Sequence, residues 1–431
     1  MKRRFLALVL AGCLAAVLST AAWADETPTA VSTADELTAA LGNAAVTSIQ
    51  LTGNIDISST LVVTKDVTLD LNGHVLKMTG KGSVIHVKSG TLTLVDNNTS
   101  AEHKFTDDNG LWKLDDNGDK VVKGGVITGG TGSTYKYNND IGQIVYNDCG
   151  GGVFVAPGAS FIMEGGNIVG CSAGKSGGGV KVTNDGDFKM SGGTISGCTA
   201  GGGGGIDNRG TTTLSDNAKI KSCSATGTGR DDHGGGVCSY RNLTVSGSMM
   251  ISGCTAQNKK SYAMYVTTGY PDARSSIEGG TFDGSVWLDH SSSGKITVSG
   301  GTFKNGASGV WTVTFNTNGG TPEPESQIRA NLPATKPDDP TKEGYNFGGW
   351  YTDAAFTTEY QFTESEKVTQ DMPLYAKWTK EAAKYYYYSP ADGSADAPKG
   401  SPKTFDPGAG IYAVSAALSL TGTAWIGLKR H

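Results

Sequence analysis

A hydrophobic residue recurs down the middle of this chain at a fixed distance from a glycine pair, from a cysteine or from both. Four copies also place a cysteine three residues later, and their isoleucines are Ile168, Ile195, Ile220 and Ile251. Three outer copies keep the frame without the cysteine, at Ile127, Phe282 and Phe303. Successive copies are 41, 27, 25, 31, 31 and 21 residues apart. A period in this range, with short β-rich stretches and glycine turns, predicts a solenoid of stacked coils.

A second marker runs in phase with the first. Three glycines followed by Val or Ile begin at Gly150, Gly177, Gly203 and Gly234, so each coil has at least two strands and two turns. Equivalent residues of stacked parallel strands form ladders about 4.8 Å apart, with glycine where the backbone turns at positive φ. Over roughly residues 31–309 the pattern resembles the right-handed parallel β-helix of the pectate-lyase-like superfamily.

The segment before the repeats fits that resemblance. Residues 32–41 combine a Ser/Thr cap, early acidic residues and apolar positions at helical spacing, which predicts a short helix able to close the open end of the solenoid. Strand-like runs follow, separated by glycine turns, at residues 48–51, 61–64, 67–71, 84–87 and 91–95. The polar, acidic stretch 98–123 breaks this rhythm, and we expect a loop projecting from one coil. The β-helix with its capping helix thus spans 25–309.

Composition argues against a disordered chain and against a nucleic-acid-binding protein. The 63 glycines among 431 residues are about twice the usual share, while only 18% of residues are charged, unlike a disordered chain. The formal net charge is −5, and no Lys/Arg run occurs outside the termini. The sequence therefore offers no basic surface for nucleic acid.

The amino terminus predicts export. A basic start, an apolar run from Phe5 to Leu18 and Ala22-Trp23-Ala24 have the pattern of a secretory signal peptide spanning residues 1–24. Leu10-Ala11-Gly12-Cys13 also matches a lipobox, which would make Cys13 a lipidated terminus. Either alternative places the chain outside the cytoplasm.

The carboxyl terminus predicts an anchor. Residues 409–428 carry no charge, are long enough to cross a bilayer and end at Lys429-Arg430, so 409–431 reads as a transmembrane helix with a basic tail. Just upstream stands a short motif made of Ser401, Pro402, Lys403, Thr404 and Phe405. It is similar to the Leu-Pro-x-Thr-Gly sorting signals of Gram-positive wall proteins, with Ser for Leu and Phe for Gly. The resemblance implies cleavage after Thr404 by a sortase and attachment to peptidoglycan. A plain membrane anchor is the alternative.

Residues 310–379 differ in composition from the solenoid. The strings Val310 to Asn316, Gly344 to Tyr351 and Leu374 to Trp378 strongly resemble one internalin-type B repeat. That family implies a small β-grasp-like module on a bacterial surface, used as a spacer or an adhesion element. We expect its aromatic residues to form the core. Residues 380–408, rich in Pro, Ser, Ala and Asp, predict an extended linker.

The repeated cysteines leave two alternatives open. Cys171, Cys198, Cys223 and Cys254 fall on one ladder, and an exported chain permits disulfides. Ladder neighbours fall inside the Cα range of a disulfide, but side-by-side Cβ atoms exceed its usual spacing. A ladder of buried thiols is therefore the alternative to disulfides. Zinc is disfavoured because no Cys-x-x-Cys or paired His spacing occurs.

Catalysis is weighed because the resembled superfamily includes polysaccharide lyases and hydrolases, whose sites use clustered carboxylates, often with calcium. One candidate group lies on an insertion between coils and consists of Arg230, Asp231, Asp232 and His233. A second, in the stretch 98–123, consists of Asp115, Asn117 and Asp119, which alternate like the start of a calcium loop. Lys120 stands where that loop needs glycine, and neither group matches an enzyme motif.

The sequence thus favours a mainly β, non-catalytic cell-surface protein: a right-handed parallel β-helix, a small β-grasp-like domain and a C-terminal transmembrane helix. We expect it to display the β-helix for adhesion, with an extracellular glycan or protein as partner, because a solenoid offers an extended surface at fixed spacing. A polysaccharide lyase or glycoside hydrolase working on one coil face is the alternative, and a structural spacer the third. Calcium is the one cofactor left open.

Overall fold

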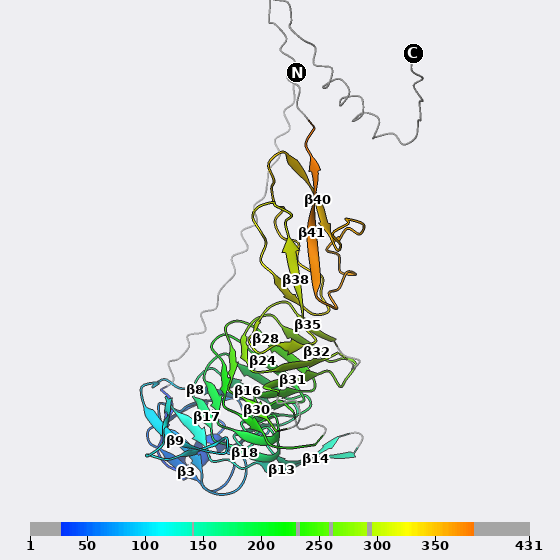
Figure 1. The fold of residues 1–431 in the computed structure, drawn as a ribbon. Helices are drawn as coiled ribbons and strands as arrows, with labels where there is room; N and C mark the ends of the chain where they lie inside the picture. Colours follow the sequence, from blue (N-terminus) through cyan, green and yellow to red (C-terminus); the bar gives the residue numbers. More distant parts are fainter. Residues whose placement is uncertain (1–26, 140–141, 230–232, 258–261, 291–294, 383–431) are drawn as a thin grey trace, which may run out of the picture. The chain divides into compact units, whose positions relative to one another are not determined.

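The computed structural model describes residues 27–139, 142–229, 233–257, 262–290 and 295–382 (Figure 1). The predicted signal peptide, the sorting motif and the C-terminal anchor lie outside these residues. Within them the chain is mainly β and its long sheets are built from parallel strands. Every coil contributes one strand to each of three long sheets along most of the solenoid, which is consistent with the predicted β-helix.

Sheet A is the longest of these sheets among the described residues, with ten strands. In spatial order its strands are β1 (Thr29–Val31), β2 (Ser48–Leu51), β5 (Val67–Asp70), β8 (Thr91–Val95), β16 (Ser160–Met163), β20 (Asp187–Met190), β24 (Thr211–Leu214), β28 (Asn242–Val245), β32 (Arg274–Ile277) and β35 (Lys295–Val298). The expected strands at 48–51, 67–71 and 91–95 are therefore confirmed.

Sheet B holds the hydrophobic residue of the first marker. Its strands in the described chain are β3 (Ile55–Ile57), β6 (Val75–Met78), β12 (Val126–Thr128), β17 (Asn167–Val169), β21 (Thr194–Ser196), β25 (Lys219–Lys221), β29 (Met250–Ser252), β33 (Thr281–Asp283) and β36 (Thr302–Phe303). The register pairs Ile127 with Ile168, and then Ile195, Ile220, Ile251, Phe282 and Phe303 in turn. All seven copies of the marker thus form one ladder, as predicted.

Sheet C holds the second marker. Its strands in the described chain are β4 (Leu61–Val63), β7 (Ile85–Val87), β15 (Val153–Val155), β19 (Val180–Val182), β23 (Ile206–Asn208), β27 (Val237–Ser239), β31 (Met264–Thr267), β34 (Val286–Asp289) and β37 (Ala307–Ser308). Val153, Val180, Ile206 and Val237 are successive partners in its register. The glycine triplets therefore mark one corner of the solenoid.

The chemistry of that corner explains the triplets. The first glycine of each triplet has a positive φ, for example +69° at Gly177, which other residues adopt at a cost. At the third glycine there is no room for a side chain, because a Cβ on Gly179 would lie 2.6 Å from the carbonyl oxygen of Gly205 and from a methyl carbon of Ile195. Close stacking of the coils thus requires glycine at both positions.

A fourth sheet, sheet E, was not expected from the sequence. It consists of β13 (Ser133–Asn139), β14 (Gly142–Cys149), β18 (Ser172–Ser176), β22 (Thr199–Gly202), β26 (Ser224–Ala225) and β30 (Thr255–Ala256). The short strands follow the repeated cysteines. Strands β13 and β14 pair antiparallel, and β14 joins β18 in parallel through Cys149 and Ser176. The β13–β14 hairpin thus extends this sheet beyond the coils.

The predicted capping helix is confirmed as α1 (Ala34–Gly42). Thr33 and Glu36 form a capping box, because the Thr33 hydroxyl accepts from the Glu36 amide while the Glu36 carboxylate accepts from the Thr33 amide. Leu37, Ala40 and Leu41 are buried in the main hydrophobic core, which runs along the interior of the solenoid. The helix therefore covers the first coil with its apolar face.

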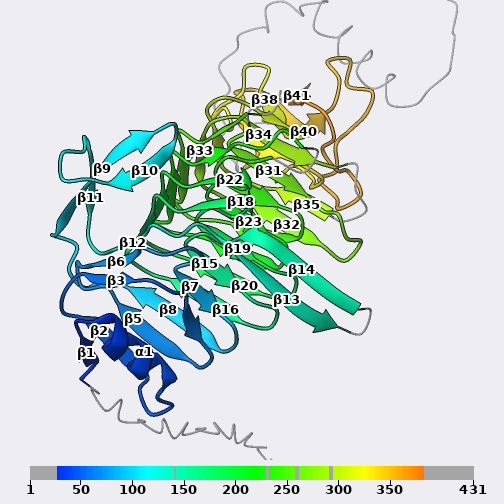
Figure 2. The same cartoon turned by 90° about the horizontal axis from the view of Figure 1, so that it is seen from below.

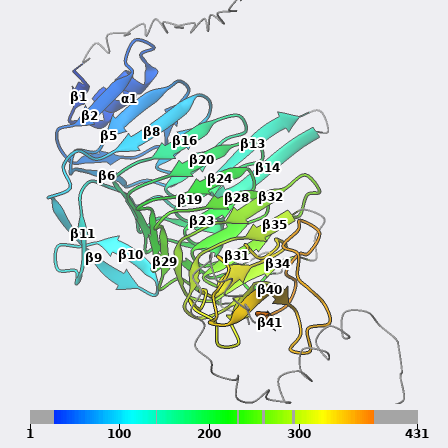
Figure 3. The same cartoon turned by 90° about the horizontal axis from the view of Figure 1, so that it is seen from above.

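The segment 98–123 differs from the projecting loop that we expected. It forms sheet D, an antiparallel sheet of β9 (Glu102–Asp108), β10 (Leu111–Leu114) and β11 (Lys120–Lys123). Trp112 is buried against Val75, Val126 and Val169, and its amide donates to the carbonyl of Gly197. Figures 2 and 3 show sheet D on one side of the coils and the β13–β14 hairpin on the other. The few apolar residues of segment 98–123 thus pack it back onto sheet B.

The region that resembles a B repeat folds around its own core. Sheet F contains β38 (Trp311–Asn316), β39 (Gln327–Arg329), β40 (Tyr345–Tyr351) and β41 (Met372–Lys380), with β38 and β41 parallel. Trp350 is 1% exposed and packs edge-on against Phe315, with ring centroids 5.1 Å apart. The expected aromatic core is therefore present. Tyr351 and Tyr375 lie only half-buried at its edge.

The described residues contain no helix with the length and apolar character needed to cross a bilayer.

Candidate functional site: a polar pocket on sheet C

One residue of each strand in sheet C points away from the solenoid interior. In β19, for example, Val180 and Val182 belong to the main core, so the intervening Lys181 faces the other side of the sheet. The register aligns these residues in one row: Val62, His86, Phe154, Lys181, Asp207, Cys238, Tyr265, Trp287 and Ser308. We call this row the sheet C face.

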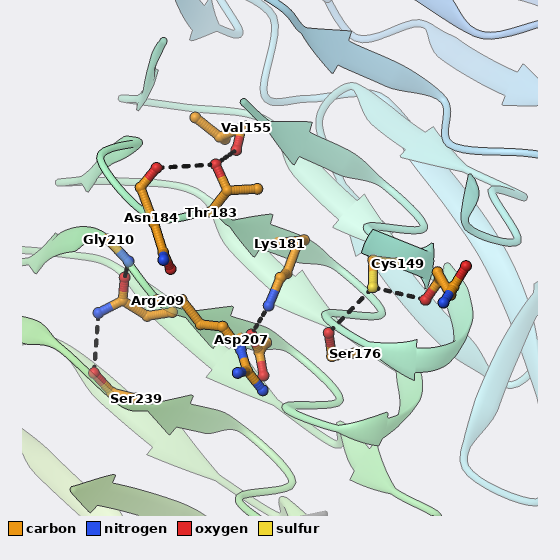
Figure 4. A network of polar contacts seen from close by, with 12 residues as sticks. Cys149, Val155, Ser176, Lys181, Thr183, Asn184, Asp207, Arg209, Gly210 and Ser239 are labelled. Atoms are coloured by element: carbon orange, nitrogen blue, oxygen red, sulfur yellow. Dashed lines mark hydrogen bonds and ion pairs between the residues drawn. The ribbon is translucent and has the colours of Figure 1, made fainter. Parts of the chain in front are cut away.

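A buried ion pair lies at the centre of the sheet C face (Figure 4). The Lys181 ammonium donates to the Asp207 carboxylate, and both residues are 1% exposed. The Arg209 Nε lies 3.5 Å from the same Asp207 oxygen, and the Arg209 guanidinium stacks 4.5 Å from the ring centre of Tyr240. Because removing two charges from water is costly, such a pair is weak evidence for stability alone. Its place beside a pocket points instead to a functional arrangement.

The pocket opens above Lys181 and has a volume of about 370 Å³. Its lining comprises Val145, Tyr146, Asn147, Cys149, Lys175, Ser176, Lys181, Asn184, Arg209 and Tyr270. Strands β14, β18 and β19 supply most of these residues, and the segments after β19, β23 and β31 supply Asn184, Arg209 and Tyr270. The pocket thus combines cationic groups, hydrogen-bonding groups and two tyrosine rings.

Two groups in the pocket are held in unusual states. The Tyr146 hydroxyl is buried without a well-aligned hydrogen-bond partner in the described chain. Burial raises the pKa of Tyr146, and the Asn184 backbone and the Arg209 charge oppose that shift only in part. Burial likewise raises the pKa of the Cys149 thiol, which contacts the Ser176 hydroxyl at 3.4 Å. Both groups are therefore neutral at physiological pH.

An aromatic cluster holds the β13–β14 hairpin against the sheet C face. Tyr135 and Tyr137 of β13 lie 4.0 and 6.3 Å from the Phe154 ring between centroids. The Tyr137 hydroxyl is 2.7 Å from His86 Nε2, and burial together with Lys88 lowers the pKa of His86 to about 4. His86 is therefore neutral at pH 7. The cluster thus packs the hairpin that carries Tyr146 onto the sheet C face.

A second aromatic group continues the sheet C face past the ion pair. Tyr265 stacks on His233 with centroids 4.4 Å apart, and Tyr262 packs 5.3 Å from Trp287. Burial raises the pKa of Cys238, between Asp207 and Tyr265 in the row, to about 12. This part of the row is therefore aromatic and uncharged beside the ion pair.

The structure describes only one of the four residues in the first predicted catalytic group. Arg230, Asp231 and Asp232 lie outside the described residues. His233 is described, and it packs on Tyr265 as stated above. Its backbone carbonyl accepts a hydrogen bond from Gly203. The catalytic role of this group stays a prediction.

The predicted calcium ligands fall in the turn between β10 and β11. The Asp115 carboxylate accepts from the Asn117 amide at 2.9 Å, and the Asp119 carboxylate pairs with Lys120 at 3.0 Å. These contacts make an ordinary Asx turn and a local ion pair. Across the described ranges, no three His, Cys, Asp or Glu side chains gather in a way that could hold a metal ion.

The cysteine ladder lies inside the solenoid, away from the pocket. Cys171, Cys198, Cys223 and Cys254 are buried free thiols in the structure, and neighbouring thiols lie within hydrogen-bonding reach of one another. Cys198 and Cys223 also point to the carbonyls of Ser196 and Lys221, at 3.3 and 3.4 Å. Burial raises the pKa of the Cys223 thiol. The disulfide alternative stays a prediction.

The pocket was not predicted from the sequence, although the repeats contain a signal for it. Phe154, Lys181, Asp207 and Cys238 each lie two residues after the last glycine of a triplet. The register makes them neighbours, so reading that one position down the repeats would have exposed the Lys–Asp pair. Tyr146 and Tyr270 had no such signal, because they come from a hairpin and a loop outside the repeat.

Comparison with known families agrees with both parts of the fold. Residues 28–141 match the family described as "Putative pectate lyase-like adhesive domain", and residues 311–377 match the Listeria-Bacteroides repeat domain. The chain thus carries a pectate-lyase-like adhesive domain and a Listeria-Bacteroides repeat, which confirms the two resemblances.

Two similar proteins come from Evansella cellulosilytica. One, named "Putative membrane protein", is 44% identical over 69 residues, which cover 16% of this chain and 10% of that protein. The other, named "Putative Gly-rich membrane protein", is 35% identical over 120 residues, which cover 25% of this chain and 14% of that protein. The matches thus cover less than a sixth of the length of either relative. No solved structure matches this chain.

Proposed function

We propose that this chain is a cell-surface adhesion protein that binds an extracellular glycan through the sheet C face. The match to a pectate-lyase-like adhesive domain and the membrane-protein names of the two relatives support a surface role. The observation that carries the binding role is the pocket above Lys181, where polar groups and two tyrosine rings gather on one sheet face. Glycan sites in general combine hydrogen-bonding groups with apolar or aromatic surface.

The orientation of the chain on the cell follows from its termini. We propose that the signal peptide directs export and that residues 409–431 hold the chain at the envelope. Thr404 is the proposed cleavage site if a sortase recognises the preceding motif and attaches the chain to peptidoglycan. The repeat and the proline-containing linker then act as a spacer between the anchor and the β-helix.

The experiment that tests binding is retention of the full chain on immobilised polysaccharides. Tyr270 lines the pocket and is 38% exposed, whereas Tyr345 lies in the repeat and is also 38% exposed. Each ring also packs against a cation, Arg241 or Lys342, at 5.0 Å. We expect Tyr270→Ala to weaken retention about tenfold through loss of a stacking surface, and Tyr345→Ala to leave it unchanged.

The same samples separate binding from catalysis. Release of polysaccharide fragments with new reducing or unsaturated ends would indicate cleavage. If the double variant Asp231→Ala, Asp232→Ala abolishes that release, the chain is a lyase or hydrolase and the binding proposal is wrong. If neither tyrosine variant alters retention, the sheet C face is not the binding surface. Equal losses in both variants would also contradict the proposal.

A further inference from the structure

The charges around the pocket are unequal. Lys175, Lys181 and Arg209 line it, and the described lining contains no Asp or Glu. The nearest carboxylate in the row is Asp207, which lies beneath the pocket at 1% exposure and contacts both Lys181 and Arg209. Asp207 therefore offsets only part of the charge of the three cations that line the pocket. A partly enclosed site with this balance attracts an anion, since interactions between charges strengthen where water is excluded.

An acidic residue beside the pocket is already paired. Asp185, next to the lining residue Asn184, contacts Arg241 at 3.3 Å. Arg241 also contacts Asp272 at 3.2 Å and packs 5.0 Å from the ring centre of Tyr270. Arg241 thus faces two carboxylates, so these three groups carry a net charge of −1, against +2 for the three cations of the lining together with Asp207. Because Lys181 is buried and paired with Asp207, the positive charge open to a ligand lies on the side of Lys175 and Arg209.

The uncharged groups of the pocket fit a sugar ring. The Tyr146 hydroxyl is buried without a well-aligned partner among the described residues, and a ligand hydroxyl could supply one. Ser176 and Asn184 add further hydrogen-bonding groups, and the exposed Tyr270 ring offers an apolar face. A volume of about 370 Å³ lies near the lower end for ligand sites, which suits one ring more than a long segment of chain.

We propose that this pocket binds a sugar residue carrying one anionic substituent, a carboxylate or a sulfate. The inference rests on the proposed function and specifies its ligand. The anion lies toward Lys175 and Arg209, and the ring lies against Tyr270. Asp207 is a positioning residue, because it holds the Lys181 and Arg209 side chains from below without reaching the ligand.

The probes are four immobilised polymers tested against the full chain at one salt concentration. Hyaluronate supplies a sugar carboxylate, dextran sulfate a sugar sulfate, dextran a neutral sugar and polyglutamate a carboxylate without sugar. We expect hyaluronate or dextran sulfate to retain the chain about tenfold more strongly than dextran or polyglutamate. The polymer that succeeds identifies the anionic group.

Two variants locate the anion, and one serves as control. Lys175 is exposed, so Lys175→Gln leaves the fold intact, and we expect it to weaken anionic retention about fivefold. Tyr146→Phe removes only the ring hydroxyl, and we expect a smaller loss. Lys189→Gln is the matched control, because Lys189 is exposed on sheet A. We expect this variant to bind like the parent chain.

The outcomes distinguish this inference from the proposed function. One outcome is equal retention of the chain on dextran, hyaluronate and dextran sulfate, with a response to Tyr270→Ala but not to Lys175→Gln. That result refutes the anionic ligand and keeps the proposal that the chain binds a glycan. Equal retention on polyglutamate and hyaluronate refutes the sugar requirement. Equal effects of Lys175→Gln and Lys189→Gln would show nonspecific charge attraction and refute the site. No retention on any polymer refutes both proposals.

Discussion

At the scale of single residues, two ion pairs on and beside the sheet C face differ in how deeply they are buried. Lys181 and Asp207 are enclosed, whereas the Asp185 side chain in the neighbouring Asp185–Arg241 pair is 77% exposed. The contribution of an ion pair depends on this difference, because water screens an exposed pair and a buried pair has no substitute for its partner. Lys181 and Asp185 belong to the same coil, so the two pairs allow a matched comparison.

Asp207→Asn should destabilise the fold strongly. The change leaves the Lys181 ammonium buried without a compensating charge, and we expect a loss of about 3–5 kcal/mol in the free energy of unfolding. Asp185→Asn at the exposed pair should cost less than about 1 kcal/mol. Denaturant unfolding of both variants measures the difference. Losses of similar size would mean that the Lys181–Asp207 pair is accessible to water.

Asp70 should make stability depend on acid pH. Burial acts to raise its pKa, but hydrogen bonds from Gln50, Asn97 and Asn72 outweigh burial and hold the pKa below 3.8. Because the folded pKa is depressed, the stabilisation is fully present above the unfolded value and is lost as pH falls through the folded value.

Asp70→Asn removes this dependence. We expect the variant to be less stable than the parent by about 1–3 kcal/mol near neutral pH, with the gap narrowing below about pH 4. Unfolding free energies measured across that range provide the check. A gap of constant size from neutral to acid pH would contradict the role assigned to the Asp70 carboxylate.

At the scale of elements, regular coils were predictable and excursions from them were not. The isoleucine and glycine markers predicted sheets B and C and their register, because each coil repeats the same packing requirement at Ile195 or Gly179. Sheet D and the β13–β14 hairpin occur once each, so no repeat signalled them. Their strands are held by aromatic side chains, Trp112 in sheet D and Tyr135 and Tyr137 in the hairpin, whose contacts depend on the folded coils.

Gly179→Ala tests the stacking requirement of the coils. A Cβ there would meet the Gly205 carbonyl oxygen at 2.6 Å, so either the corner must shift or the coils must separate. We expect a loss of about 2–4 kcal/mol in unfolding free energy. The control is Gly53→Ala, because a Cβ at Gly53 has no neighbour within 4 Å. We expect this change to stay within about 1 kcal/mol. Tolerance of Ala at position 179 would disprove close stacking at this corner.

At the scale of the whole molecule, the described chain has separate hydrophobic cores. One runs through the solenoid, and another in the repeat includes Val313, Phe315, Trp350 and Leu374. Composition alone indicated this division, since the aromatic strings of residues 310–379 end the glycine-rich pattern. Function was less predictable, because the pocket needs residues from the β13–β14 hairpin, from β18 and β19, and from the segments after β19, β23 and β31. Only folding brings these parts of the chain together.

Trp350→Ala should affect the repeat and leave the solenoid intact. The side chain is 1% exposed in the centre of the repeat core, and we expect a local loss of about 3–5 kcal/mol. Hydrogen exchange should then accelerate in β38, β40 and β41 while sheets A to C keep their protection. Equal acceleration in sheet B would show that the two cores unfold as one unit.

The central claim is that the sheet C face binds a glycan, and hydrogen exchange of the full chain with and without a retained polysaccharide tests it most directly. We expect slower exchange in β14, in β19 and at Asn184, which surround the pocket, and unchanged exchange in β20 and β24 of sheet A. Protection confined to sheet A or to the repeat, with none around Lys181, would contradict the account.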